Sequence, residues 1–259
     1  MTEPIRFEDG AAYERFMGRW SQLVGTRFLE WIDPQHGWDW IDVGCGNGAF
    51  TALIVDHHAP ASVHGVDPSE AQLAFARERF AGKPVRVEQG HALDLPRDAD
   101  SADAAVMPLV LSFVPDPARG VQEMARVVRE GGVVSAYMWD MDGGGFPYHV
   151  LHDRIRARGG TVPLPPVPEA SRLDVMESLW RGAGLGDVRV ETIRVTRVFD
   201  SFDEFWTTAK GGPSAGQALR AMSDESLGTL RDEMRDVVTR DSAGRVLMEG
   251  WANAVRGTV

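Results

Sequence analysis

A short apolar stretch that runs into three glycines constrains the fold of this chain more than any other feature. Residues 40–50 read Trp-Ile-Asp-Val-Gly-Cys-Gly-Asn-Gly-Ala-Phe, and a helical pattern follows them. Glycines at this spacing let the backbone turn tightly and let a ligand approach without a Cβ in the way. The following helix directs its free N–H groups and positive end at that turn. A strand, a glycine turn and a helix start together predict a nucleotide-binding corner.

Apolar, strand-like segments alternate with helical patterns between residues 38 and 139. The expected strands cover residues 38–43, 61–66, 85–89, 103–107 and 133–139. This alternation predicts an α/β protein with a parallel, doubly wound sheet, in which ligands bind beyond the carboxyl ends of the strands. Two later segments, 188–199 and 244–252, predict a sixth strand and an antiparallel last strand.

An acid ends the second expected strand, in the sequence Asp67-Pro68-Ser69. A carboxylate at this place can accept hydrogen bonds from both hydroxyls of a ribose. Its distance along the chain from the glycine turn is what a strand–helix–strand unit of this type requires. The alternative role for Asp67 is the N-cap of the next helix, but Ser69 could fill that role instead. We therefore expect Asp67 to bind a ribose.

The spacing Asp-x-Gly-x-Gly-x-Gly, from Asp42 to Gly48, resembles motif I of the class I S-adenosylmethionine-dependent methyltransferases. A dinucleotide fingerprint would read G-x-G-x-x-G instead. The resemblance extends over residues 38–198 and the closing strand. It implies a seven-stranded sheet, mostly parallel with an antiparallel last strand. It also implies S-adenosyl-L-methionine as the cofactor and methyl transfer by in-line displacement to a small-molecule acceptor.

The same resemblance implies how the cofactor is held. In the family, the loop after the third strand covers the adenine ring, and the end of the fourth strand faces the methionine part. The family's usual Gly-Asp-Ala is Gly90-His91-Ala92 here, and a neutral imidazole nitrogen can also accept one hydrogen bond. The expected cofactor-binding residues are Tyr13, Trp20, Asp42, Gly44, Cys45, Gly46, Asn47, Asp67, Pro68, Ser69, His91, Ala92, Leu93, Met107 and Pro108.

Three segments outside the alternating pattern are expected to close the site within a single domain, 1–259. Residues 1–32 predict a helical flap, in which aromatic residues such as Tyr13 and Trp20 either pack in the core or cover the cofactor. Residues 141–170 and 200–243 predict lid insertions, because long irregular segments in a compact domain usually serve function. Ser171 is expected to cap the helix that follows the first insertion.

No strong general base is visible where many members of the resembling family carry a histidine, because the nearest match is Ser112. His149 and His152 in the first insertion are candidate bases, since helical spacing places them near one face, although surface or packing histidines are the alternative. Aromatic residues on the insertions would suit a flat or apolar acceptor, or would simply pack the lid. Oxygen, nitrogen and carbon acceptors all stay open, as does the oligomeric state.

The composition of the chain limits the kinds of partner that we expect it to bind. The formal net charge is -11 and no Lys/Arg cluster is visible, so neither nucleic acid nor an anionic membrane is an expected partner. The first ten residues have no apolar core of a signal peptide, and no apolar run is long enough to span a bilayer. The single cysteine, Cys45, can form no internal disulfide and no cysteine-based metal site. We expect a cytoplasmic protein that uses no metal.

Two other functions compete with a methyltransferase. The first is a non-catalytic S-adenosylmethionine-binding protein, which the missing base would allow. The second is an oxidoreductase that uses NAD on the same type of sheet. The glycine spacing argues against NAD, and no Tyr-Lys pair for hydride transfer stands in a recognisable context.

Overall fold

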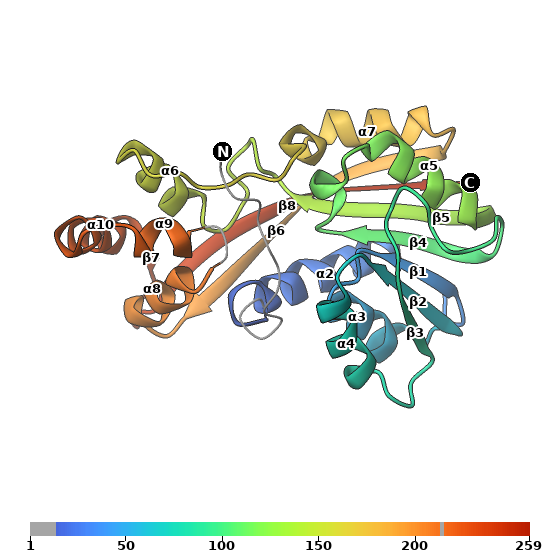
Figure 1. Cartoon of the computed structure of the whole chain (residues 1–259), viewed down its shortest axis with the longest axis horizontal. Helices are drawn as coiled ribbons and strands as arrows, with labels where there is room; N and C mark the ends of the chain where they lie inside the picture. The colour runs from blue at the N-terminus through green and yellow to red at the C-terminus, as the bar shows by residue number, and fades with distance from the viewer. Residues whose placement is uncertain (1–13, 213–214) are drawn as a thin grey trace.

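The computed structural model describes residues 14–212 and 215–259, and a mixed sheet forms its centre (Figure 1). The strand order is β3-β2-β1-β4-β5-β8-β6, with β7 added beside β8. The strands are Asp39–Val43 (β1), Ser62–Asp67 (β2), Val85–Gln89 (β3), Ala102–Pro108 (β4), Val128–Trp139 (β5), Gly186–Phe199 (β6), Thr239–Arg240 (β7) and Val246–Thr258 (β8). Strands β1 to β5 pair in parallel, and β8 runs antiparallel to both β5 and β6. The predicted α/β, doubly wound sheet with an antiparallel last strand is confirmed.

The sheet differs from the prediction at two places. Strand β5 begins at Val128 rather than at residue 133, because the preceding helix ends early and a register shift lets Val128 pair with Ala102. The short strand β7 was not expected. It forms a hairpin with the start of β8 through a turn in which Asp241 N–H donates to the Arg245 carbonyl at 3.1 Å. The last strand accordingly starts after that turn and extends to Thr258.

Helices cover both faces of the sheet. In Figure 1, α2 (Arg19–Ile32), α3 (Ala49–His58) and α4 (Glu70–Arg79) lie below it, and α5 (Pro117–Val127) and α7 (Leu173–Gly182) lie above it. Alternate residues of β4 pack on opposite faces of the sheet. Ala104 and Val106 belong to one apolar cluster, and Ala105 and Met107 belong to the other. The side chain of Met107 therefore belongs to the α5 side.

A second, smaller lobe lies beyond the carboxyl ends of the parallel strands, at the left of Figure 1. It contains α6 (His149–Ala157), α8 (Phe202–Lys210), α9 (Gly216–Arg220), α10 (Asp224–Val237) and β7. The last residue of β5, Trp139, pairs with Ala252, and residues 246–251 of β8 continue past it into this lobe beside residues 194–199 of β6. We call this part the insertion lobe. Two long strands thus connect it to the main sheet.

The described part of the N-terminal segment connects the two lobes. A π-helical turn, Glu14–Gly18, precedes α2 directly. Phe16 stacks on Tyr148 of the insertion lobe with ring centroids 4.5 Å apart. The indole N–H of Trp20 donates to the hydroxyl of the same tyrosine at 3.3 Å. Tyr13 lies outside the described residues.

The predicted N-cap at Ser171 is wrong. A 3₁₀ turn, Pro168–Ser171, precedes α7, and Arg172 takes the N-cap position without a side-chain hydrogen bond. The Ser171 hydroxyl instead donates to the Pro168 carbonyl at 2.7 Å and accepts from the Met141 N–H at 3.1 Å. It therefore holds the two ends of the first insertion together, a contact between distant segments that local helix chemistry does not predict.

Candidate cofactor site

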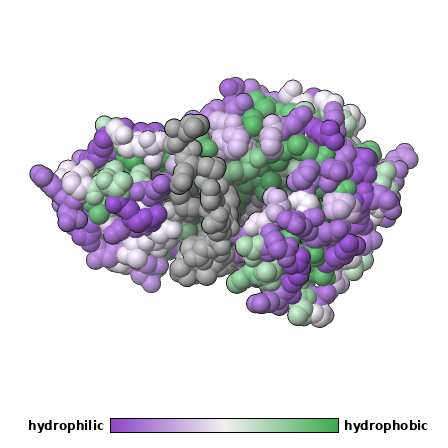
Figure 2. All heavy atoms as spheres, viewed as in Figure 1, coloured by the Kyte–Doolittle hydropathy of each residue, from purple (hydrophilic) through white to green (hydrophobic). Residues whose placement is uncertain are grey.

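A cavity of about 440 Å³ lies at the carboxyl ends of the central strands. Figure 2 shows hydrophobic atoms, in green, gathered in the hollow of the larger lobe. The residues that line the cavity are Ser21, Asp42, Gly44, Cys45, Gly46, Asn47, Ala49, Phe50, Asp67, Pro68, Ser69, Gln72, Pro108, Leu109, Val110, Phe113 and Tyr137. They come from α2 and from the ends of β1, β2, β4 and β5, which is where a doubly wound sheet binds its ligand.

The glycine turn has two packed positions and one open one. Gly44, Gly46 and Gly48 adopt φ angles of +75°, +53° and +80°, which side chains rarely tolerate. A Cβ at Gly44 would lie 2.4 Å from a methyl group of Val110, and one at Gly48 would lie 2.3 Å from the Phe80 ring. At Gly46 a Cβ would meet nothing within 4 Å. The backbone at Gly46 is thus open to close approach by a ligand.

Asp67 ends β2 and organises this turn. Its two carboxylate oxygens accept the N–H of Gly46 at 2.9 Å and the N–H of Ser69 at 2.8 Å. The hydroxyl of Ser69, not Asp67, caps α4 by accepting the Gln72 N–H. Burial raises the pKa of Asp67, and these two backbone hydrogen bonds oppose that rise. Each oxygen retains a further lone pair for hydroxyl donors, as a ribose site requires.

Asp42 is a fully buried carboxyl group in the wall of the same cavity. One of its oxygens, Oδ2, accepts the Thr51 hydroxyl at 2.6 Å, while Oδ1 has no hydrogen-bond partner among the described residues. Burial raises the pKa of Asp42 to about 7, against the lowering effect of the Thr51 bond and with a smaller rise from Asp67. An unpaired buried oxygen is costly, so its place beside a cavity suits a ligand that donates hydrogen bonds.

Cys45 fills space in the turn. Its sulfur packs against Gly65, where a Cβ would lie 2.8 Å away, and the residue is 6 % exposed. Burial, and then the carboxyl groups of Asp42 and Asp67, raise the pKa of the thiol. A protonated, buried thiol is a poor nucleophile.

Some of the expected cofactor residues do not line this cavity. Trp20 is buried and turned toward Tyr148, and Met107 packs on the α5 side. In the loop after β3, His91 is exposed. Ala92 packs in the α5-side cluster, and the Leu93 carbonyl accepts the Arg119 Nε–H at 3.0 Å. This loop therefore stays a predicted adenine contact outside the described cavity.

Several lining residues were missed from the sequence, and one has an unusual backbone. Leu109 follows β4 with a φ of +60°, and its N–H donates to the Tyr137 carbonyl at 2.8 Å. Non-glycine residues in this region are uncommon and cluster at functional sites. Of the lining residues between 108 and 113, the sequence predicted only Pro108, at the end of β4. Tyr137 lies in the fifth expected strand and Ser21 in the N-terminal segment, and neither residue was singled out from the sequence.

Ser112, the nearest match to the family's usual histidine, is not at the cavity. It is fully buried in the 3₁₀ turn Leu111–Phe113, and its carbonyl accepts the Val167 N–H of the first insertion at 3.0 Å. Its neighbour Phe113 lines the cavity instead. The aromatic ring of Phe113 therefore lines the cavity next to the position at which a general base was expected.

The two candidate histidines lie in the insertion lobe, outside the described cavity. His152 is 3 % exposed and stacks on Phe146 with ring centroids 5.0 Å apart. Burial, and then the charge of Arg156, lower the pKa of His152 to about 3. His149 donates from Nδ1 to the Phe146 carbonyl at 3.0 Å. These contacts suit packing histidines.

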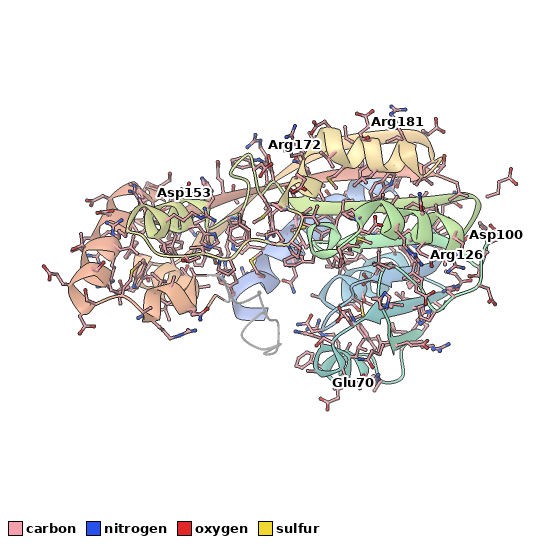
Figure 3. The ribbon with its side chains drawn as sticks, turned by 45° about the horizontal axis from the view of Figure 1, so that its top comes forward. Glu70, Asp100, Arg126, Asp153, Arg172 and Arg181 are labelled. Atoms are coloured by element: carbon pink, nitrogen blue, oxygen red, sulfur yellow. The ribbon has the colours of Figure 1, made fainter. Side chains whose placement is uncertain are left out.

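Some charged side chains outside the cavity form ion pairs at the surface. Figure 3 shows Arg172 and Arg181 projecting from the two ends of α7. They form ion pairs with Asp174 at 2.8 Å and with Glu177 at 2.7 Å. Within the described residues, no group of His, Cys, Asp and Glu side chains is arranged to hold a metal ion. None of the helices in the described part of the chain has the length and apolar run that crossing a bilayer needs.

Comparison with known proteins supports the family resemblance for the central part of the chain. Residues 41–136, which include the glycine turn, Asp67 and β4, match a family model described as a methyltransferase domain. These residues therefore form a methyltransferase domain. The fold agrees, because the YcgJ protein from Bacillus subtilis superposes with a TM-score of 0.60 at 19 % identity over 91 % of this chain and 97 % of that one.

The named relatives of this methyltransferase domain share only part of their length with it. The 2-methyl-6-phytyl-1,4-hydroquinone methyltransferase 1, chloroplastic, of Oryza sativa is 37 % identical over 117 residues, which are 45 % of this chain and 36 % of the relative. A demethylmenaquinone methyltransferase of Desulfitobacterium hafniense is 34 % identical over 111 residues, or 41 % and 44 % of the two chains. The chain therefore spans less than half of the length of these relatives.

The cofactor prediction is confirmed at the level of the family. The phosphoethanolamine N-methyltransferase 2 of Haemonchus contortus, solved with S-adenosyl-L-methionine, has a TM-score of 0.57 at 18 % identity over 95 % of this chain and 56 % of that one. The methyltransferase domain thus has the fold of a protein that holds this cofactor. The family match favours it over NAD.

Proposed function

We propose that this protein is an enzyme that transfers the methyl group of S-adenosyl-L-methionine to a small, apolar acceptor. One observation carries the proposal: the open glycine turn, a buried carboxylate bonded to that turn and a second buried carboxyl with an unpaired oxygen all lie in one cavity. A cofactor with a ribose and an ammonium group matches these groups in chemistry.

Each part of the cavity has a proposed role. Asp67 binds the ribose hydroxyls, because it is already oriented by Gly46 and retains free lone pairs. Asp42 binds the ammonium group of the amino-acid tail through its unpaired oxygen. The adenine ring extends toward the predicted loop at residues 90–96. The cofactor supplies a methyl group activated by its sulfonium.

The acceptor is proposed to be flat and apolar, of the quinol type. Leu109, Val110, Phe113 and Tyr137 give one wall of the cavity an apolar and aromatic character that suits such a ring. Two relatives are named for hydroquinone and menaquinone substrates. Because these relatives match over less than half of their own length, this acceptor class is a hypothesis that rests mainly on the wall.

Catalysis would then depend on alignment rather than on a strong base. Holding two reactants in line can supply roughly 7–11 kcal/mol of the barrier. The enclosed, apolar wall would exclude water and strengthen the remaining polar contacts. His149 and His152 lie away from the cavity, so we do not assign them a proton-transfer role.

An assay of product formation tests the proposal. The protein is incubated with S-adenosyl-L-methionine and a series of quinols, phenols and amines, and S-adenosylhomocysteine is measured. We expect turnover with quinols above that with amines. Calorimetric titration with S-adenosyl-L-methionine and NAD runs in parallel, and tighter binding of NAD would contradict the proposal. Cofactor binding without turnover on any acceptor would favour the alternative, a non-catalytic binding protein.

The cellular compartment stays a prediction. We propose a cytoplasmic protein because the single cysteine can form no internal disulfide. The plant relatives are named as chloroplastic. Fractionation of the source cells followed by immunodetection would test the predicted compartment.

A further inference from the structure

Ser21 is a buried serine of α2 whose hydroxyl has no hydrogen-bond partner among the described residues. The residue is 6 % exposed and lines the cavity. Serine and threonine within helices usually bond back to the carbonyl one turn earlier. Thr26 in the same helix does so, donating to the Gln22 carbonyl at 2.9 Å. The Ser21 hydroxyl is therefore available to a ligand in the cavity.

Helix α2 is held firmly in place, so Ser21 has a fixed position. The Trp20 indole bonds to Tyr148 of the insertion lobe. At the other end of the helix, Arg256 of β8 donates to the Ile32 carbonyl at 2.7 Å. Between these anchors, Gly25 packs so closely on α3 that a Cβ would lie 2.7 Å from the Leu53 side chain. A preorganised hydroxyl loses little freedom when it binds a ligand.

The rest of the cavity indicates which group this hydroxyl meets. The described lining residues include no Lys, Arg or His, so no cationic side chain among them could pair with a carboxylate. Ser21 is a neutral donor that can bond to an anionic oxygen. Asp42, which also lines the cavity, has a buried oxygen without a partner, and a carboxylate oxygen suits an ammonium group. Together, the two atoms complement the adjacent carboxylate and ammonium of an amino acid.

We propose that Ser21 donates a hydrogen bond to the carboxylate of the cofactor's amino-acid tail, which makes α2 part of the cofactor site. This inference rests on the proposed function. It also assigns the N-terminal segment a role in selecting ligands: compounds that lack the carboxylate bind without the Ser21 contribution. Ser21 is thus a specificity-determining residue for the cofactor.

Calorimetric titration with three ligands tests the assignment. The ligands are S-adenosyl-L-methionine, its decarboxylated form, and 5′-methylthioadenosine, which lacks the whole tail. We expect Ser21→Ala to weaken binding of S-adenosyl-L-methionine about tenfold, since the lost bond is to a charged group. Affinity for the decarboxylated form and for 5′-methylthioadenosine should not change. Thr26→Ala, which removes a hydroxyl from the surface of the same helix, should leave all three affinities unchanged.

The three affinities separate a bond to the carboxylate from a purely structural role of Ser21. An equal loss for all three ligands would mean that Ser21 only shapes the cavity, and unchanged binding would mean that it touches no carboxylate. Either result overturns this inference while wild-type binding still supports the proposed function. Absence of S-adenosyl-L-methionine binding by the wild type would overturn both. If Ser21→Ala does not fold, Ser21→Cys keeps the size with a weaker donor and should show the same selective loss.

Discussion

Two cavities of this protein differ in size, place and chemistry. The cofactor cavity of about 440 Å³ lies at the carboxyl ends of the strands. A groove of about 790 Å³ lies at the amino ends of β2 and β3. We call it the edge groove, and it is lined by residues 62–64, 83–86, 96–98 and 101. The larger of the two is the weaker candidate for a ligand site.

The difference lies in how the polar groups are satisfied. In the edge groove, Lys83 pairs with Asp56 at 3.1 Å, Arg86 with Glu88 at 2.5 Å, and Arg97 donates to Ser101. None of its described side chains has a buried polar atom without a partner. In the cofactor cavity, Ser21 and Asp42 each have such an atom. Buried polar atoms are normally hydrogen-bonded, so unpaired ones mark the site better than volume does.

Substitution of Gly44 in the cofactor cavity should lower the cofactor affinity most, whereas the matched substitution near the edge groove should not change it. Gly44→Ala places a Cβ 2.4 Å from Val110, at a φ of +75°. Val110 is stiff, so the turn or the cavity wall must move, and we expect at least about a 100-fold loss of cofactor affinity. The matched control is Gly82→Ala, near the edge groove, where φ is +77° and a Cβ meets nothing within 4 Å. Calorimetry should show unchanged affinity there. Wild-type affinity in Gly44→Ala would show that the packing of Gly44 on Val110 does not shape the cofactor site.

Removal of the ribose-binding carboxylate should have the next largest effect. Asp67→Ala should weaken cofactor binding by about 1–3 kcal/mol through its lost hydrogen bonds. The control is Asp56→Ala, which frees Lys83 beside the edge groove and should leave the affinity unchanged. Titration calorimetry of the folded variants measures both. Equal affinities of Asp67→Ala and the wild type would show that the ribose lies elsewhere.

Asp42 should make cofactor binding depend on pH. Its pKa of about 7 means that the carboxyl is mostly protonated at pH 6 and half ionised at pH 7. A cationic ammonium prefers the ionised form, so affinity should rise with pH, about fivefold from pH 6 to pH 7. The range ends at pH 7 because an α-amino group itself begins to titrate above it, near 7.7–8.0.

Proton release identifies the group that titrates. Binding at pH 6 should release close to one proton, which calorimetry in buffers of different ionisation enthalpy detects. Asp42→Asn cannot titrate, so its affinity should be flat over this range. Asp67 also has a raised pKa and lies nearby, so a slope that persists in Asp42→Asn would assign the effect to Asp67.

Local patterns predicted the sheet side of the cofactor cavity. The glycine turn, Asp67 and the Ser69 cap each depend on a few consecutive residues, and the strand ends follow from the alternation of the chain. Residues that reach the cavity from distant elements could not be predicted in this way. Ser21 is an ordinary helical serine in sequence, and the left-handed Leu109 is fixed by a bond to the Tyr137 carbonyl.

The insertions were located by their irregularity, but their contacts were not predictable. Ser171 has the local pattern of an N-cap, yet a contact with Met141 uses its hydroxyl and the helix starts later. His149 and His152 were candidate bases by spacing alone, but His149 bonds to the Phe146 carbonyl and His152 stacks on the Phe146 ring. Periodicity reports which face of a helix is apolar but not what covers that face, which only tertiary structure decides.

The smallest effect on stability and cofactor affinity is expected from a change in the edge groove. Ligand binding in this groove would contradict the conclusion that it is the weaker candidate site. Lys83→Ala breaks an ion pair whose side chains are 41 % and 54 % exposed, so the free energy of unfolding should change by only about 0–1 kcal/mol. Cofactor affinity should stay the same. If the groove instead holds an anion, added inorganic phosphate would raise the melting temperature of the wild type but not of Lys83→Ala. We expect no such difference, because each described cation of the groove already has a partner.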